Sequence, residues 1–542
     1  MIHNPILPGF NPDPSICRVG ADYYIATSTF EWYPGVQIHQ SRDLVNWQLL
    51  SRPLNRASQL DMRGNPDSCG IWAPCLSFAD GLFWLVYTDV KRYDGNFKDT
   101  HNYIVTAASI DGPWSDPVFV NSSGFDPSLF HDGDGRKWFI NMVWNHRSAS
   151  VGGKPRAAAF DGILLQQWDA ETRQLAGPVT NIFKGTALGL VEGPHLFKRQ
   201  GWYYLTTAEG GTGYNHAVTM ARSRQIAGPY ELHPLQHIIT SKDAPDAVLQ
   251  RAGHGQIVET PDGLTYHTHL CSRPLAGLQR SPLGRETAIQ RCEWRDDGWL
   301  YLADVPEGSV VPKLLVPAPH PTPPPQPRQA LRRSFKTCTT LPMEFQWLRT
   351  PQPERLFTLT GDALRLFGRE SIGSFFEQSL VARRQEDFDF RAETTLLSFD
   401  PVTYQQSAGL TLYYSRHKFH YLSLSWDAAL GRVLTLMSCV GDWPDGRMEF
   451  GLDQPLPVPD GPIRLAAEVH GPALQFFCDL GSGWQAIGGA LDASVISDEG
   501  GSRGVHGSFT GAFIGMLVFD TSGAGCPADF GHFDYAPLKE IA

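Results

Sequence analysis

One short pattern of polar and apolar positions recurs five times in the first part of the chain. An acidic or polar residue precedes a Pro or Gly, an apolar strand start follows, and after a turn comes a strand led by aromatic residues. The copies begin at Asp13, Ala73, Asp126, Glu192 and His254, and their second strands begin at residues 23, 83, 138, 203 and 265. Near-constant spacing within the copies and irregular spacing between them predict one β-hairpin used five times.

A repeat of 55 to 65 residues made of short strands is typical of a propeller blade. Each blade has about four strands, and echoes at Trp47, Trp114 and Tyr230 fit the outer strands. Five copies therefore predict a five-bladed β-propeller. Equivalent positions on the innermost strands form a ring around a propeller axis, so we expect the five leading residues at one end of the central channel.

The composition changes sharply after Val311. Eight prolines stand between residues 312 and 327, which favours an extended, semi-rigid connector. Beyond it, apolar and polar positions alternate again and turn signals separate the segments, as in an antiparallel β-sandwich. The fold class is therefore predicted as all-β: a propeller over residues 1–311, a connector over 312–331 and a C-terminal sandwich over 332–542.

Length and charge narrow the class of protein. The chain has 542 residues, and single cores stop growing at about 250–300 residues, which agrees with two domains. The net charge of −11 without a basic run argues against nucleic acid or an anionic membrane as a partner. A neutral ligand such as a sugar fits better.

The N-terminus has no charged leader or apolar core of signal-peptide type, and no apolar run reaches the roughly 18 residues that span a bilayer. Nine cysteines lack paired spacing, which is typical of reduced thiols. Cys17 and Cys75 are expected to be buried as small hydrophobic residues. The expectation is a cytoplasmic protein.

Three of the five leading residues are carboxylates, namely Asp13, Asp126 and Glu192. Hydrolysis of a glycosidic bond needs a protonated acid at the leaving oxygen and a carboxylate on the opposite face. The two groups stand about 6.5–9.5 Å apart when the carboxylate activates water and about 5–5.5 Å apart when it attacks directly. Positions on non-adjacent blades favour the wider separation, which predicts inversion of anomeric configuration.

The blade order suggests a role for each carboxylate. We expect Asp13 to be the general base and Glu192, with its longer side chain, the general acid. Asp126 in the neighbouring blade is expected to raise the pKa of the acid and to orient it. For any one Asp-Pro, a simple turn or cap is a common alternative, but three carboxylates at equivalent positions favour a shared site.

Other candidate residues have more than one interpretation. His254 is a metal ligand, a substrate contact or a hydrogen-bonded axial residue. No second ligand stands at recognisable spacing, so we predict no required cofactor and leave Ca²⁺ or Na⁺ on the axis open. Phe30, Trp72 and Trp144 follow inner-strand segments and form either a sugar-stacking platform or part of the core.

Four motifs together resemble glycoside hydrolase family 43, and within it the two-domain β-xylosidases. They are NPILPGFNPDPS (4–15), GFDPSL (124–129), VEGPH (191–195) and FTGAFIGM (509–516). The motifs are specific as a set and weak singly, and the resemblance spans the whole chain. It implies a five-bladed propeller, inverting chemistry and the same three carboxylate roles.

The resemblance also implies a pocket for one terminal xylose, with Arg285 holding sugar hydroxyls and Phe509 of the sandwich closing the end. The complete set of expected substrate-binding residues is Phe30, Trp72, Ala73, Trp144, His254, Arg285 and Phe509. Members of this group tend to be intracellular homo-oligomers, so a dimer or tetramer is expected.

The leading hypothesis is thus an exo-acting enzyme that releases D-xylose from the non-reducing ends of xylobiose and short β-1,4-xylo-oligosaccharides. An α-L-arabinofuranosidase or arabinan-cleaving enzyme is the alternative within the family. A non-catalytic sugar-binding propeller is the alternative from another class. All three carboxylates are present, which argues against pure binding because a lectin needs no general acid.

Overall fold

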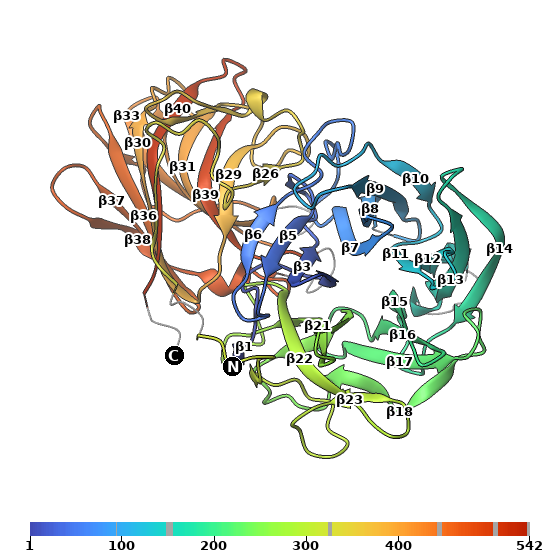
Figure 1. Cartoon of the computed structure of the whole chain (residues 1–542). Coiled ribbons are helices and arrows are strands. Elements are labelled where there is room, and N and C mark those ends of the chain that lie inside the picture. The colour runs from blue at the N-terminus through green and yellow to red at the C-terminus, as the bar shows by residue number, and fades with distance from the viewer. Residues whose placement is uncertain (94, 148–155, 324–327, 442–446, 502–507, 539–542) are drawn as a thin grey trace.

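The computed structural model describes residues 1–93, 95–147, 156–323, 328–441, 447–501 and 508–538. Strands dominate these residues, and the helical segments among them are short. Five small sheets surround a common axis, and a two-sheet sandwich lies beside them (Figure 1). The all-β class and the order of propeller then sandwich, both predicted from the sequence, are confirmed.

Each propeller sheet follows chain order from its inner to its outer strand. The first blade contains β2 (Ser15–Val19), β3 (Asp22–Thr27), β5 (Gln37–Ser41) and β6 (Gln48–Ser51). The second contains β7 (Gly70–Ala79), β8 (Leu82–Arg92), β9 (Asp99–Ala107) and β10 (Val118–Asn121). The third contains β11 (Ser128–His131), β12 (Lys137–Trp144), β13 (Phe160–Asp169) and β14 (Gln174–Phe183).

The last two blades repeat this order. The fourth contains β15 (Glu192–Arg199), β16 (Trp202–Glu209), β17 (Ala217–Ser223) and β18 (Glu231–Thr240). The fifth contains β19 (Gln250–Gly253), β20 (Ile257–Glu259), β21 (Thr265–Ser272), β22 (Glu286–Trp294) and β23 (Leu300–Leu302), with β19 and β20 both paired to β21. The second strands begin within one residue of their predicted starts.

The aromatic and branched residues that lead these strands pack between neighbouring blades. Ile25 of the first blade shares a buried cluster with Tyr266 and Ile289 of the fifth. Trp84 of the second blade shares another with Phe139 of the third. Such residues favour strands because their side chains fit between pleated surfaces, and here both faces of a blade are covered.

The N-terminal segment closes the ring between the first and fifth blades. The backbone of Leu7 exchanges two hydrogen bonds of 3.2 Å with Thr287, and the Asn4 side chain bonds both the N–H and the carbonyl of Ile289. Before it, β1 (Ile2–His3) pairs with β24 (Leu315–Val316). The proline-rich connector therefore contains a short strand, which the proline pattern alone did not predict.

The C-terminal domain consists of two antiparallel sheets. One sheet contains β25 (Leu331–Ser334), β27 (Phe357–Leu359), β28 (Leu364–Phe367), β30 (Asp389–Ser398), β36 (Ile463–His470), β37 (Ala473–Asp479), β38 (Gln485–Asp492) and β40 (Pro527–Pro537). The other contains β29 (Ser379–Arg384), β31 (Gln406–Ser415), β32 (Lys418–Asp427), β33 (Gly431–Val440), β34 (Glu449–Phe450), β35 (Leu456–Pro457) and β39 (Phe513–Asp520).

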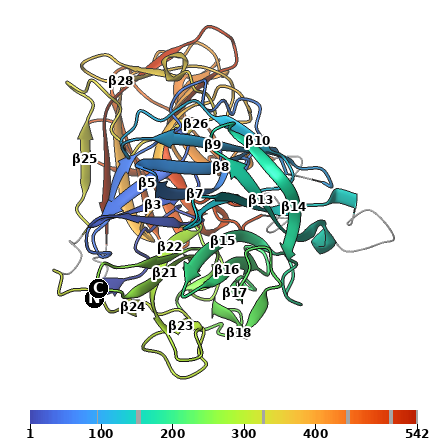
Figure 2. The same cartoon turned by 45° about the vertical axis from the view of Figure 1, so that its right-hand side comes forward.

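Strand and ring contacts join the two domains directly. β4 (Trp32–Tyr33) of the propeller pairs with β26 (Trp347–Leu348), which follows the connector. The Trp32 ring stacks on Phe513 of β39 with centroids 3.7 Å apart. Figure 2 shows strands of the sandwich, drawn in orange, behind β3 and β5 of the first blade. The domains thus share a continuous buried interface beside the first blade.

A buried ion pair strengthens this interface. The Arg349 guanidinium donates to Asp67 of the propeller at 2.7 Å and to the Asn65 carbonyl at 2.7 Å. Arg416 of the sandwich reaches the second oxygen of Asp67 at 3.0 Å. A buried charge that loses its partner is costly, so this cluster holds the two domains at one relative position.

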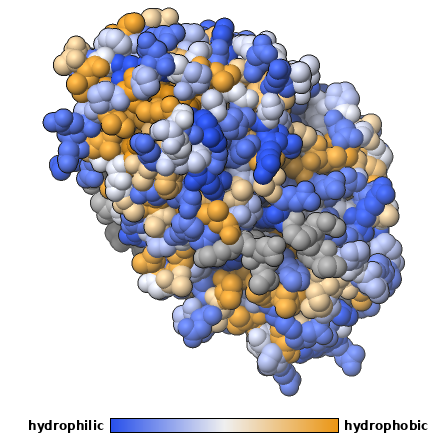
Figure 3. All heavy atoms as spheres, turned by 90° about the vertical axis from the view of Figure 1, so that its left-hand side faces the viewer, coloured by the Kyte–Doolittle hydropathy of each residue, from blue (hydrophilic) through white to orange (hydrophobic). Residues whose placement is uncertain are grey.

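The surface adds little about partners. The face of the sandwich side in Figure 3 mixes hydrophilic and hydrophobic residues. Among the described residues, no helix has the length and apolar character needed to cross a membrane. All nine cysteines lie in the described part of the chain and are free, with Cys17 and Cys75 buried as predicted.

Replacing Arg349 by Ala should lower the free energy of unfolding by about 3 kcal/mol, the lower end for breaking a buried pair, because Arg416 still neutralises Asp67. Urea unfolding followed by tryptophan fluorescence measures this loss. The matched control is Arg365→Ala, whose side chain is 40% exposed and paired with Asp529. That variant should lose only about 0–1 kcal/mol. Equal losses in both variants would contradict a special role for Arg349.

Candidate active site

The five leading residues are almost closed to solvent, with exposed fractions between 4% and 7%. Four of them have left-handed backbone conformations: φ is 56° at Asp13, 32° at Ala73, 53° at Asp126 and 46° at His254. Such conformations cost about 1–3 kcal/mol outside glycine and cluster at functional sites. The common backbone bend supports their equivalence, which the sequence repeat predicted.

The fourth blade departs from this equivalence. There Gly193, with φ of 56°, takes the left-handed position, and Glu192 lies one residue earlier. The pairing of β15 with β16 shifts register between Glu192 and His195, just as the pairing of β7 with β8 does between Trp72 and Cys75, so Gly193 corresponds to Ala73 and Glu192 to Trp72. Glu192 is therefore not at the same repeat position as Asp13 and Asp126, which corrects the simple alignment of the five copies.

Asp13 lies among cationic and hydrogen-bonding groups. Arg285 donates to its Oδ1 at 3.1 Å, Ser28 donates to its Oδ2 at 2.7 Å, and the Nδ1 of His254 is 3.8 Å from Oδ1. The Ser28 hydroxyl in turn accepts from the N–H of Ala73 at 2.7 Å. Burial raises the pKa of the Asp13 carboxyl, but Arg285, His254 and Ser28 together outweigh burial and hold that pKa below its ordinary value.

The pKa values of the other two carboxyl groups, Asp126 and Glu192, are shifted upward instead. Burial, and then the negative charge of Asp13, raise the pKa of Glu192 to about 8, although Arg285 and Lys98 oppose the shift. Burial, Glu192 and Asp13 raise the pKa of Asp126 well above its ordinary value, and its Oδ2 accepts from the N–H of Gly193 at 3.1 Å. The three carboxyl groups thus interact within one site, with Asp13 the ionised member.

His254 lies between the first and fourth blades. Its ring faces Asp13 on one side and is 6.3 Å from the His195 ring. A Cβ atom on Gly193 would come within 3.0 Å of the His254 ring, so only glycine fits there without displacement. In the described residues, no group of three or more His, Cys, Asp or Glu side chains could hold a metal ion. A cation on the axis stays a prediction.

Phe30, Trp72 and Phe509 form an aromatic cluster beside Asp13. Their ring centroids are 5.8 Å (Phe30 to Trp72), 5.9 Å (Trp72 to Phe509) and 6.5 Å (Phe30 to Phe509) apart. The Arg285 guanidinium lies 5.2 Å from the Phe30 ring and 5.9 Å from the Phe509 ring. The structure therefore brings the sandwich residue Phe509 to the propeller residues with which it was predicted to act.

The predicted residue Trp144 joins this cluster through side chains that the sequence analysis missed. Phe125 lies 5.4 Å from Trp72 and 6.5 Å from Trp144. Tyr93 contacts both Trp72 and Phe509, and the Nζ of Lys98 lies 4.6 Å from the Trp144 ring. Trp144 also donates from Nε1 to the Asn96 carbonyl at 2.9 Å.

The residues that the sequence analysis missed differ in how far the sequence could have predicted them. Phe125 directly precedes Asp126 in the third repeat, so its place was readable. Tyr93 and Lys98 lie between β8 and β9, outside any repeat, and Ser28 follows β3 without a motif of its own. For these three, only the folded chain shows that they belong to the site.

A propeller with a buried set of carboxylates beside aromatic rings defines a class of carbohydrate-cleaving hydrolases. Comparison of the chain with known protein families identifies which of these hydrolases it resembles. A family model described as "Glycosyl hydrolases family 43" matches residues 2–300, and one described as "Beta xylosidase C-terminal Concanavalin A-like domain" matches residues 332–536. The chain belongs to glycosyl hydrolase family 43 and is a glycoside hydrolase.

Similar proteins cover the chain from end to end. "Xylosidase/arabinosidase 43B" of Humicola insolens is 57% identical over 99% of this chain and 98% of its own length. A "Beta-xylosidase" of Bacillus subtilis is 45% identical over 98% and 99%. The crystal structure of a xylan beta-1,4-xylosidase from Bacillus halodurans matches with a TM-score of 0.93 and 47% identity, covering 99% of this chain and all of that one.

The electrostatic effect of Lys98 on Glu192 predicts a shift in pH dependence. Lys98 lowers the pKa of Glu192, so Lys98→Ala should raise that pKa further. Protonated Glu192 is lost as pH rises through its folded pKa, and the basic limb of kcat/KM should therefore move to higher pH.

The measurement is a pH–rate profile on an oligosaccharide substrate. Lys184→Ala is the control, because Lys184 is exposed and its nearest carboxylate is Asp161 at 3.6 Å. It should leave the profile where it is. A basic limb that stays in place or moves to lower pH in Lys98→Ala would argue against the electrostatic contact.

Proposed function

We propose that this protein is an exo-acting, inverting β-xylosidase that releases D-xylose from the non-reducing ends of xylobiose and short β-1,4-xylo-oligosaccharides. The observation that carries the proposal is the opposite displacement of two carboxyl pKa values in one site: Asp13 is held ionised, and the pKa of Glu192 is raised to about 8. Such a pair supplies a base and an acid at neutral pH.

In this mechanism ionised Asp13 accepts a proton from a water molecule as the water attacks the anomeric carbon. Glu192 donates its proton to the glycosidic oxygen, so that the leaving sugar departs as a neutral alcohol. The carbon–oxygen bond to the leaving sugar breaks while the bond to water forms on the opposite face. The configuration inverts, and proton exchange with solvent restores both carboxyl groups.

Asp126 acts in this scheme by orientation. Its Oδ2 accepts from the N–H of Gly193, the residue after Glu192, so it holds the bulge that carries the acid. The negative charge that raises the pKa of Glu192 is chiefly that of Asp13. The earlier expectation that Asp126 itself modulates the pKa of the acid therefore stays a prediction.

Exo action rests on how the sandwich approaches the propeller. Phe509 packs against Phe30 and Trp72, and its carbonyl accepts from Arg285 at 2.7 Å. The Nε of Arg285 is buried and has no acceptor among the described residues. A buried donor without an acceptor is costly, so we assign Arg285, together with the predicted residues Ala73, Trp144 and His254, to the binding of one terminal sugar.

The choice of xylose follows the names of the relatives, two of which are called β-xylosidases. The second candidate activity is that of an α-L-arabinofuranosidase. It is favoured by the 57% identical relative, which is named for both activities. Rates on the nitrophenyl β-D-xyloside and α-L-arabinofuranoside decide between them. A non-catalytic sugar-binding protein is disfavoured, since binding needs no raised carboxyl pKa.

Three further expectations accompany this proposal: a homodimer or homotetramer, a cytoplasmic location, and Ca²⁺ or Na⁺ on the axis without a required cofactor. They follow from the sequence and the family resemblance, and each stays a prediction.

Glu192→Gln should slow hydrolysis of xylobiose by about 10²–10⁴-fold, the usual effect of losing a general acid. It should slow nitrophenyl xyloside hydrolysis far less, because nitrophenolate leaves without protonation. Steady-state rates on both substrates test the role. The control is Asp132→Asn, a buried carboxylate of the same propeller that pairs with Lys198 and Tyr203. Equal loss on both substrates would exclude Glu192 as the acid.

The stereochemistry is predicted to be inversion, because Asp13 and Glu192 come from the first and fourth blades and activate water rather than attack the sugar. Proton NMR of the first product from xylobiose should show α-xylose, followed by slow mutarotation. Initial β-xylose would establish a covalent intermediate and remove the general-base role of Asp13.

A further inference from the structure

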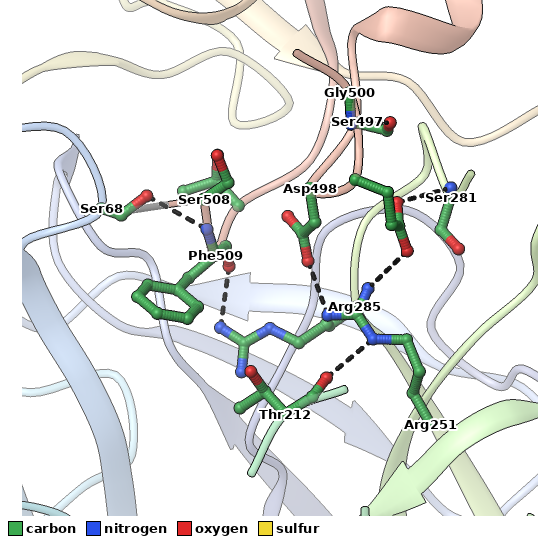
Figure 4. A network of polar contacts seen from close by, with 12 residues as sticks. Ser68, Thr212, Arg251, Ser281, Arg285, Ser497, Asp498, Gly500, Ser508 and Phe509 are labelled. Atoms are coloured by element: carbon green, nitrogen blue, oxygen red, sulfur yellow. Dashed lines mark hydrogen bonds and ion pairs between the residues drawn. The ribbon is translucent and has the colours of Figure 1, made fainter. Parts of the chain in front are cut away.

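Figure 4 shows two hydrogen-bonded groups, Arg251 with Asp498 and Phe509 with Ser68 and Arg285. They are parts of one chain of hydrogen bonds that ends at Asp13. It begins at Arg251 of β19, whose guanidinium donates to Asp498 at 2.9 Å, Glu499 at 3.0 Å and the Thr212 carbonyl at 2.7 Å. Arg251 and Asp498 are both buried. A propeller arginine therefore anchors the sandwich segment that leads toward Phe509.

Tyr414 of β31 continues the chain. Its buried hydroxyl donates to the second oxygen of Asp498 and accepts from the N–H of Thr510 at 2.8 Å. On the other side, the N–H of Phe509 donates to the hydroxyl of Ser68 at 3.1 Å. Two successive backbone N–H groups are thus held by side chains from opposite domains.

The carbonyl between these two N–H groups faces the active site. It accepts from one nitrogen of Arg285 at 2.7 Å, and another nitrogen of Arg285 donates to Asp13 at 3.1 Å. Close backbone packing supports this placement: a Cβ on Gly284 would lie 2.3 Å from the Thr510 carbonyl oxygen. The Phe509 carbonyl is therefore the acceptor that fixes the direction of the Arg285 guanidinium.

We propose that Tyr414, held by Asp498, is a positioning residue for the hydrolytic reaction: it fixes the Phe509–Thr510 peptide so that the Phe509 carbonyl aims Arg285 at Asp13. The inference rests on the proposed function, in which Asp13 is the base. It makes the sandwich responsible for the charge state of a propeller carboxylate, in addition to lending the Phe509 ring.

The pH profile separates this role from mere stability. With Arg285 displaced, the pKa of Asp13 should rise, and ionised Asp13 should be lost at a higher pH as conditions become acidic. A nearby guanidinium typically lowers an Asp pKa by about 1–3 units. We therefore expect the acid limb of the kcat/KM profile of Tyr414→Phe to move to higher pH by about one pH unit. The other groups around Asp13 keep their contacts: His254, His216, Asp126 and Glu192.

The matched control is Tyr421→Phe on the adjacent strand β32. That tyrosine is equally buried, and its hydroxyl donates to the Leu517 carbonyl at 2.8 Å, away from Phe509. Both variants should lower the melting temperature, whereas only Tyr414→Phe should move the acid limb. An acid limb identical in Tyr414→Phe, Tyr421→Phe and the wild type would overturn the proposal.

Two further variants make every outcome decisive. Ser68→Ala removes the longer of the two hydrogen bonds that hold the Phe509–Thr510 peptide, so it should move the acid limb to higher pH by a smaller amount. This variant replaces Tyr414→Phe if Tyr414→Phe does not fold. Asp13→Asn tests the function beneath the inference. If Asp13→Asn hydrolyses xylobiose normally, the proposed function fails and the inference with it. If Asp13→Asn is inactive and the acid limb stays in place in Tyr414→Phe and Ser68→Ala, the inference alone fails.

Discussion

Three carboxyl groups share one buried site, and burial by itself favours the protonated form of each. The guanidinium of Arg285 breaks this symmetry, because it contacts Asp13 directly and thereby stabilises one negative charge in a defined place. That charge then raises the pKa values of Glu192 and Asp126. In the proposed mechanism, the assignment of one carboxyl group as base and another as acid therefore depends on one ion pair between the first and fifth blades.

The two domains are coupled by reciprocal buried arginines. Arg251 of the propeller pairs with Asp498 and Glu499 of the sandwich, and Arg349 of the sandwich pairs with Asp67 of the propeller. Separating the domains would leave unpaired charges on both surfaces, which is strongly unfavourable. The sandwich is thus a fixed wall of the candidate active site, although its two sheets are separate from the blades of the propeller.

Much of this architecture could be predicted from the five-fold repeat in the sequence. The five hairpins, the domain order and the three carboxylates follow from Asp-Pro and aromatic signals at near-constant spacing. Ser28, Tyr93 and Lys98 were not readable, because each lies beyond the repeated segments and reaches the site only through the closed ring. Tyr414 was hidden for another reason: in sequence it is an ordinary aromatic residue in a sandwich strand.

Glu192 lies one residue before the repeat position, which Gly193 occupies, and this offset gives the site an asymmetry that the proposed inverting mechanism can use. Five equivalent positions would present their side chains symmetrically around the axis, whereas an acid and a base must approach the sugar from opposite faces. In the fourth blade the left-handed position belongs to Gly193, so Glu192 starts from a β-bulge one residue away. Gly193 also leaves room for the His254 ring and donates to Asp126. The side chain of Glu192 thus starts one residue away from the repeat position, and its surroundings raise its pKa whereas those of Asp13 lower the pKa of that carboxyl.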